Sequence, residues 1–148
     1  MLYVRFYITI SGTNFQPDCV VDKLNTSLVV EDIVTDYSFG DNWNMMQLFH
    51  KNEFSKEYYD DEYEREFVDF FKNNYELLKK YGAEDFTLMM DIYCCDQCNF
   101  EIFDKDKLPE LAKGDVSLPI SVYYLEPDNY YIDLYYKLNP DLEYGERL

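Results

Sequence analysis

The chain has 148 residues, and its 30 acidic and 13 basic residues give a formal net charge of −17. It also contains 16 tyrosines and 11 phenylalanines, whereas disordered acidic segments have few aromatics, so the composition predicts a folded domain. The negative charge argues against nucleic acid and anionic lipid as ligands and favours cationic partners, which it attracts over long range.

A chain of this length fits one domain with a core of normal size. No stretch approaches the ~20 consecutive apolar residues of a membrane span, and residues 1–7 lack the basic start and apolar run of a signal peptide. Three of the four cysteines crowd into positions 94–98, which is a poor disulfide framework and indicates reduced thiols. We therefore expect a cytoplasmic protein without membrane contacts.

The first part of the chain is expected to contain three strands and a short helix. Residues 2–11 alternate, which is typical of a strand packed on one face; the apolar positions are Leu2, Val4, Phe6, Ile8 and Ile10. Pro17 suits the first turn of a short helix over residues 17–25. Residues 28–34 are β-prone, and residues 43–50 are expected to pair back as a further strand.

A long helix is expected over residues 54–81. Its buried stripe recurs at spacings of three and four through Phe67, Phe70, Phe71, Asn74, Leu78 and Tyr81. Gly82 then provides a natural C-terminal stop. The first part of this segment, residues 53–66, is far more polar and carries seven acids against two bases.

The rest of the chain predicts further strands around a second short helix. Residues 86–93 alternate strictly, and residues 99–103 are the expected partner strand across a tight turn at 94–98. Asp104 is expected to cap a short helix that Gly114 ends. Residues 118–124 form another alternating strand, in which Pro119 indicates an edge position or a strand start.

These elements together predict an α+β fold, with a mainly antiparallel sheet and two or three helices packed on one face. Residues 1–125 are expected to form a single α+β domain. Residues 126–148 then form an acidic, aromatic C-terminal extension, with an added strand at 129–137 and a loose tail.

Two parts of the chain resemble a bacterial protein family. The similar segments are Ile10-Ser11-Gly12 with Phe15-Gln16-Pro17-Asp18, and Met90-Asp91-Ile92-Tyr93 with Asn99-Phe100-Glu101-Ile102, the helix at 108–112 and Ile120-Ser121-Val122-Tyr123. They resemble domain-of-unknown-function family 4279 over most of residues 2–125. The resemblance implies a compact α+β fold and a bacterial source, and it assigns no catalytic residues.

No catalytic constellation is recognisable. His50 is the only histidine and has no distinct partner in the sequence, so it is expected to be structural. The five glycines are isolated and form no phosphate-binding loop. A carboxylate cluster at Asp60, Asp61, Glu62 and Glu64 has the groups for acid/base work or for a hard cation, but such a run on a helix is more often a solvated face. We therefore expect a protein without enzymatic activity or a cofactor.

The cysteine-rich turn has three interpretations. Cys95 and Cys98 provide one zinc knuckle next to Cys94, yet no second pair follows, and only Cys19, His50 or Cys94 is left to complete a site. A redox pair would need a helix start, whereas this segment is expected to join two strands. The three interpretations are a hairpin in which the cysteines are incidental, a metal site, and a redox pair. The alternative function is accordingly a domain that binds a metal or a small ligand through this turn.

The leading hypothesis is a non-catalytic protein-interaction module that binds a basic partner. No lysine or arginine lies between Lys23 and Lys51, and two of the acidic segments interleave acids with tyrosines. The sharpest version is an immunity protein that covers the cationic active site of a toxin such as a nuclease. The competing interpretation is that the acidity serves only solubility. The expected partner-binding residues are Tyr58, Tyr59, Asp60, Asp61, Glu62 and Tyr63.

Overall fold

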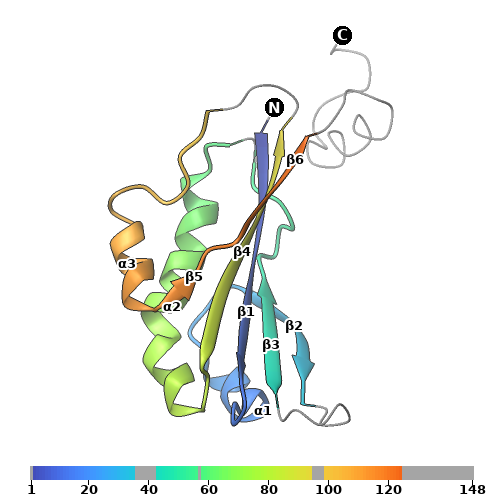
Figure 1. The fold of residues 1–148 in the computed structure, drawn as a ribbon, viewed down its shortest axis with the longest axis vertical. Coiled ribbons are helices and arrows are strands. Elements are labelled where there is room, and N and C mark those ends of the chain that lie inside the picture. The colour runs from blue at the N-terminus through green and yellow to red at the C-terminus, as the bar shows by residue number, and fades with distance from the viewer. Residues whose placement is uncertain (1, 36–42, 57, 95–98, 125–148) are drawn as a thin grey trace.

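A computed structural model describes residues 2–35, 43–56, 58–94 and 99–124 of the chain (Figure 1). In chain order the elements are β1 (Leu2–Gly12), α1 (Pro17–Val20), the 3-10 turn η1 (Val21–Lys23), β2 (Val29–Val34), β3 (Asn44–Phe49), α2 (Asp61–Lys80), β4 (Asp85–Cys94), α3 (Leu108–Lys113), β5 (Val116–Ser117) and β6 (Ile120–Tyr124). No helix within these ranges is long and apolar enough to cross a membrane.

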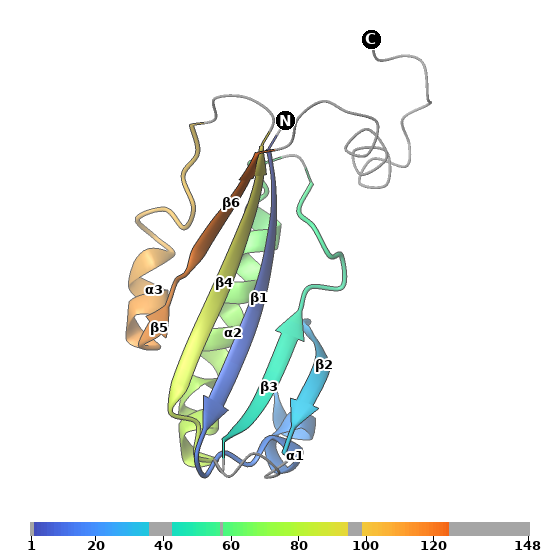
Figure 2. The same cartoon turned by 45° about the vertical axis from the view of Figure 1, so that its right-hand side comes forward.

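The strands form one six-stranded sheet in the order β2-β3-β1-β4-β5, with β6 also paired to β4. The β2–β3, β3–β1 and β1–β4 pairs are antiparallel, whereas β5 and β6 both run parallel to β4. Figure 2 shows α2 running along one face of the sheet, behind β1 and β4, and α3 lies against α2. The predicted α+β fold with a mainly antiparallel sheet is confirmed.

The core lies between α2 and the sheet, and it is built from the alternating apolar positions that the sequence indicated. On β1 and β4 the buried set consists of Leu2, Val4, Phe6, Ile8 and Ile10 together with Phe86, Leu88, Met90 and Ile92. The α2 stripe contributes Phe67, Phe70, Phe71 and Leu78. The Phe6 ring is central to this packing, because it lies 5.5 Å from the rings of Tyr63, Phe67 and Phe103.

The predicted stop of the long helix at Gly82 is confirmed. Gly82 has a φ of 88°, in the left-handed region that disfavours side chains, and its amide donates to the carbonyl of Lys79. A Cβ at this position would lie 2.4 Å from the carbonyl oxygen of Asn14. The glycine thus allows α2 to end where the loop after β1 crosses it.

The prediction that the long helix begins at residue 54 was wrong, because α2 begins at Asp61. The preceding segment lies along the N-terminal half of β1, beyond the point where β3 pairs with that strand. There the amides of Ser55 and Tyr58 donate to the carbonyls of Val4 and Leu2, at 2.9 and 2.8 Å. Hydrogen bonding to the sheet edge therefore replaces the expected first turns of the helix.

The prediction of a strand at residues 99–103 was also wrong, because this stretch contains no strand and leads away from β4. Phe103 is buried with a φ of 54°, which is incompatible with an extended strand. The neighbour of β4 is instead β6, which runs parallel to it after the crossover through α3.

The two short helices differ from their predicted bounds and caps. The first helix is shorter than the expected residues 17–25, since α1 and η1 together reach only Lys23. The N-cap of α3 is Lys107 and not the predicted Asp104. The carboxylate of Asp104 accepts from the amides of Asp106 and Lys107, at 3.0 and 3.1 Å, and so caps the turn that precedes α3. The predicted strand at 129–137 and the extension 126–148 lie outside the described residues.

Candidate functional site

A groove of about 600 Å³ opens beside the first turns of α2, between that helix and the connection from β3. Its lining contains four carboxylates and two lysines together with the rings of His50, Phe54 and Tyr63. The charged members are Glu53, Asp60, Glu62, Glu66, Lys51 and Lys56. The two lysines are outnumbered, so the walls of the groove carry net negative charge.

The carboxylates on the α2 side follow from helical spacing. Glu62, Glu66 and Asp69 are separated by four and three residues, which places them on one face of the helix. A second hollow of about 170 Å³ adjoins the groove and shares Glu66, and Asp69 is also part of its lining. We call Glu53, Asp60, Glu62, Glu66 and Asp69 the acidic groove.

His50 forms the buried base of this groove. Its Nδ1 lies 2.9 Å from the amide nitrogen and 3.0 Å from the carbonyl oxygen of Asn52, and its Nε2 lies 3.1 Å from Oε2 of Glu66. The imidazole ring also packs 4.6 Å from the ring of Tyr63. His50 is therefore a satisfied structural residue, and its partner Glu66 comes from a helix that the sequence alone could not place beside it.

The six predicted partner-binding residues divide between two places. Asp60 and Tyr63 line the acidic groove but also hold the fold, whereas Glu62 lines it with an exposed side chain. Asp60 caps α2, because its carboxylate accepts from the amides of Tyr63 at 3.2 Å and Lys56 at 2.9 Å. The hydroxyl of Tyr63 accepts from the amide of Phe6, and burial raises the pKa of this tyrosine.

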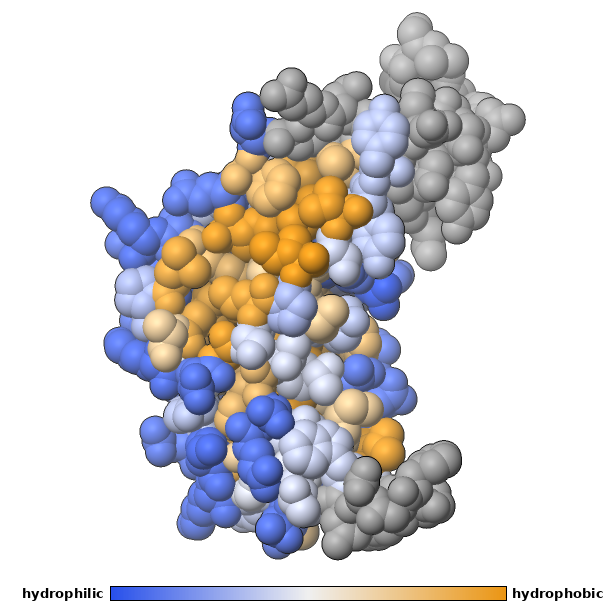
Figure 3. Space-filling view, in the orientation of Figure 1, coloured by the Kyte–Doolittle hydropathy of each residue, from blue (hydrophilic) through white to orange (hydrophobic). Residues whose placement is uncertain are grey.

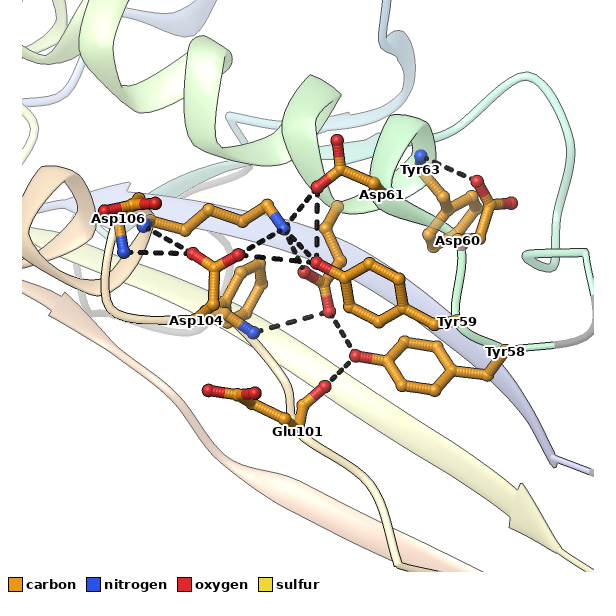
Figure 4. Close-up of polar contacts among 11 residues, drawn as sticks. Tyr58, Tyr59, Asp60, Asp61, Tyr63, Glu101, Asp104 and Asp106 are labelled. Carbon is orange, nitrogen blue, oxygen red and sulfur yellow. Dashed lines mark hydrogen bonds and ion pairs between the residues drawn. The ribbon is translucent and has the colours of Figure 1, made fainter.

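Tyr58, Tyr59 and Asp61 lie outside the groove and converge on Lys107 and its neighbours. Figure 4 shows Tyr59, Asp61 and Asp104 directed toward one amine nitrogen, with Tyr58 beside them. That nitrogen is Lys107 Nζ, which lies 2.5 Å from Asp61 Oδ1, 2.6 Å from the Tyr59 hydroxyl, 2.9 Å from Glu64 Oε2 and 3.4 Å from Asp104 Oδ2. These five residues form the Lys107 cluster.

The Lys107 cluster is buried at its centre, since the side chains of Lys107 and Glu64 are both 0% exposed. Burial acts to lower the pKa of Lys107, but the hydrogen bonds to Asp61, Tyr59 and Glu64 outweigh it and raise the pKa above its usual value. The hydrogen bond from Lys107 in turn lowers the pKa of Asp61. The amine is thus held as a cation, which suits a structural ion pair rather than a nucleophile or a base.

Glu64 extends this cluster toward the chain that precedes α3. Its Oε1 accepts from the Tyr58 hydroxyl at 2.7 Å and from the amide of Phe103 at 3.3 Å. The Tyr58 hydroxyl also contacts the carbonyl of Glu101, and burial followed by the bond to Glu64 raises the pKa of Tyr58. The cluster therefore fastens residues 101–107 to α2. The sequence marked Glu64 only as one acid of a charged run and did not mark Lys107, because the two residues meet only when separate segments pack together.

The face of the sheet that points away from α2 carries several aromatic side chains. Phe54, which lines the acidic groove, packs at 5.4 Å against Tyr93 of β4, and Tyr93 stacks at 5.0 Å on Tyr123 of β6. Nearby, Arg5 of β1 is the register partner of Asp91 of β4. Burial raises the pKa of Asp91, and Arg5 opposes that shift. Arg5 therefore offsets part of the cost of burying this carboxylate.

The cysteine hypothesis is only partly within the described ranges. Cys94 ends β4 and is buried, Cys19 is exposed on α1, and Cys95 and Cys98 lie outside the described residues. Among the residues that are described, no three His, Cys, Asp or Glu side chains gather as a metal site would require. A metal or redox role of the turn stays a prediction, and elemental analysis of protein purified without chelator measures it.

Comparison with protein-family models, with curated proteins and with solved structures gives no match. The resemblance to domain-of-unknown-function family 4279 therefore stays a prediction.

Proposed function

We propose that this protein is a non-catalytic interaction module that binds a basic protein partner through its acidic groove. The observation that supports this proposal is the line of Glu62, Glu66 and Asp69 along two adjoining hollows. A concave surface of one charge sign concentrates the field and raises the encounter rate with an oppositely charged partner. The groove has the size and charge to receive lysine or arginine side chains.

The composition of the groove also favours a protein partner. The half-buried ring of Phe54 lies among its carboxylates and supplies apolar contact area next to hydrogen-bond acceptors. Interfaces combine aromatic anchors with peripheral charge in this way, and arginine is enriched on the partner side. The net charge of −17 extends the attraction beyond the groove itself.

The sharpest form of the proposal is an immunity protein that covers the cationic active site of a toxin such as a nuclease. Such a site binds phosphate through lysines and arginines, and an acidic groove competes for the same side chains. The predicted partner-binding residues differ in their exposure and in their contacts within the chain. Glu62 is exposed, and Tyr59 is 52% exposed although its hydroxyl accepts from Lys107. Asp61 is 57% exposed although it pairs with Lys107, whereas Asp60 and Tyr63 are held by hydrogen bonds within the fold.

The test compares two variants of equal net charge. In the first, Glu62→Gln and Asp69→Asn neutralise the acidic groove; in the second, Asp22→Asn and Glu76→Gln neutralise two exposed acids elsewhere. Both variants and the natural chain serve as bait for proteins of the source organism at low and at high NaCl. The association rate of each captured basic protein is then measured by surface plasmon resonance.

We expect the groove variant to associate several-fold more slowly than the control variant, with a flatter dependence on salt, because steering acts through local charge. Equal association rates for the two variants would show that only net charge matters and would refute the groove as the binding site. Binding that no salt concentration changes would refute electrostatic recognition altogether.

A further inference from the structure

The two edges of the sheet differ in their protection. At one edge, β2 carries Glu31 and Asp32 and has a β-bulge between Val30 and Asp32. Charges and bulges on an edge strand prevent other chains from pairing with it. At the other edge, β6 has the sequence Ile-Ser-Val-Tyr-Tyr, with no charged residue and a regular register against β4. In the part of the chain that the structure describes, β6 pairs with β4 alone.

The side chains of β6 are unusually exposed for apolar residues. Ile120, Val122 and Tyr124 are 55%, 59% and 60% exposed. Their register partners on β4 are Met90, Ile92 and Cys94, which are buried, so the exposed set continues the core-facing side of the sheet beyond its helical cover. Figure 3 shows a broad apolar surface over the upper half of the molecule, where β6 lies in the same orientation.

Alternate residues of β6 direct their backbone amides and carbonyls away from β4, where another strand is able to pair with them. The amide of Met90 donates to the carbonyl of Pro119 at 3.0 Å, and Met90 is the register partner of Ile120. In a parallel ladder this geometry turns the polar groups of the odd-numbered β6 residues toward β4. The amides and carbonyls of Ile120, Val122 and Tyr124 therefore point to the free edge.

We propose that the free edge of β6 pairs with β6 of a second copy of this chain. An antiparallel pair centred on Val122 is self-complementary, as a two-fold interface must be. Ile120 then lies opposite Tyr124 of the second copy, and the small Ser121 lies opposite the large Tyr123. Because opposite residues share a face, the apolar sets of both copies join into one surface on the helical side of an extended sheet.

Charge determines where two such copies meet. Two chains of −17 repel each other, so close contact requires a strip without carboxylates. The β6 edge is such a strip, and the β2 edge, with Glu31 and Asp32, is not. The pairing also has a characteristic salt response. Backbone bonds and apolar contacts are little affected by salt while the repulsion is screened, so self-association strengthens as NaCl rises.

The experiment measures the mass of the full chain by sedimentation velocity over a range of concentrations and NaCl. The test variant is Val122→Lys on β6, and the matched control is Val29→Lys on β2, where the valine is 45% exposed on the opposite edge. Circular dichroism and thermal melting establish that both variants are folded. Hydrogen exchange of the amides of Ile120, Val122 and Tyr124 is followed at the same concentrations.

We expect a dimer that tightens with salt, the same dimer for Val29→Lys, and at least about tenfold weaker association for Val122→Lys, which places two like charges directly opposite each other. Protection of the three amides should rise with protein concentration. A natural chain that stays monomeric at every salt concentration would overturn the inference. Concentration-independent protection in the monomer would overturn it too, because the chain's own residues would then occupy the edge.

A monomer whose three amides exchange freely but become protected in the presence of a captured partner would show that the edge serves another protein, and it would also overturn the pairing of two copies. The salt response separates this inference from the proposed function. Binding of a basic partner weakens as NaCl rises, whereas pairing through β6 strengthens, so either is able to fail while the other holds.

Discussion

Removal of the Lys107 amine is the most direct perturbation of the structure. Lys107→Met keeps the length and apolar stem of the side chain but withdraws the cation from Glu64, and both side chains are fully buried. Glu64 keeps its contacts with the Tyr58 hydroxyl and the Phe103 amide, which do not supply a countercharge. Removing one partner of a buried pair leaves an uncompensated charge and costs about 3–5 kcal/mol.

The assay is urea unfolding followed by circular dichroism, with a thermal melt as a second measurement. A loss of this size lowers the melting temperature of a domain of this length by about 10 °C. The matched control is Lys113→Met, whose ion pair with Glu110 spans 3.5 Å and whose side chain is 73% exposed. Exposed pairs contribute little, so the control should lose no more than about 0.5 kcal/mol.

A double variant separates the lost countercharge from lost packing. Lys107→Met with Glu64→Met removes both buried charges, and well-packed apolar replacements of buried pairs are often neutral or stabilising. We therefore expect the double variant to recover most of the stability lost by Lys107→Met. A single variant within about 1 kcal/mol of the natural chain, or a double variant no better than the single one, would refute the buried ion pair as the fastening of residues 101–107.

Three further outcomes follow from the same contacts. Asp60→Ala removes the α2 cap and should cost about 1 kcal/mol in urea unfolding, whereas Asp60→Asn, which also caps, should cost only a few tenths. The pKa values of Asp61 and Asp104 are lowered in the folded chain, so the contribution of these carboxylates to stability is complete above the usual value of 3.8 and is lost as the pH falls below it. The difference in unfolding free energy between the natural chain and Asp61→Asn should therefore be constant above about pH 5 and disappear in acid. A constant difference down to about pH 2 would contradict this expectation. Glu62→Gln with Asp69→Asn should change stability by less than about 0.5 kcal/mol, because these acids line a solvated groove; a larger loss would show that they hold the fold.

Local patterns were sufficient wherever neighbouring residues determine the conformation. The alternation in β1, β3 and β4 was readable because every second side chain of a strand faces the core. The stripe of α2 and its end at Gly82 were readable for the same reason, since helical spacing and a positive φ are local properties. The concentration of acids on the first turns of α2 was equally visible, and three of the predicted contact residues do line the groove.

The failures occurred where distant segments compete for the same backbone groups. Residues 54–60 were expected to continue the long helix, yet Ser55 and Tyr58 bond to the open edge of β1 instead. Residues 99–103 resemble a strand, yet Glu64 of α2 and the buried Phe103 hold them away from β4, and β6 takes that place. The residues of these two segments do not determine either conformation by themselves, because each depends on which distant segment of the chain folds next to them.

The sequence by itself determined the class of the fold, the positions of its core residues and the excess of negative charge, all of which are set by composition and by spacing along one element. Only the tertiary structure decided which acids pair with cationic or imidazole groups of the same chain. It paired Asp61 with Lys107 and Glu66 with His50, and it left Glu62 exposed, because the strength of a carboxylate's interactions depends on the groups that folding places within a few ångströms of it.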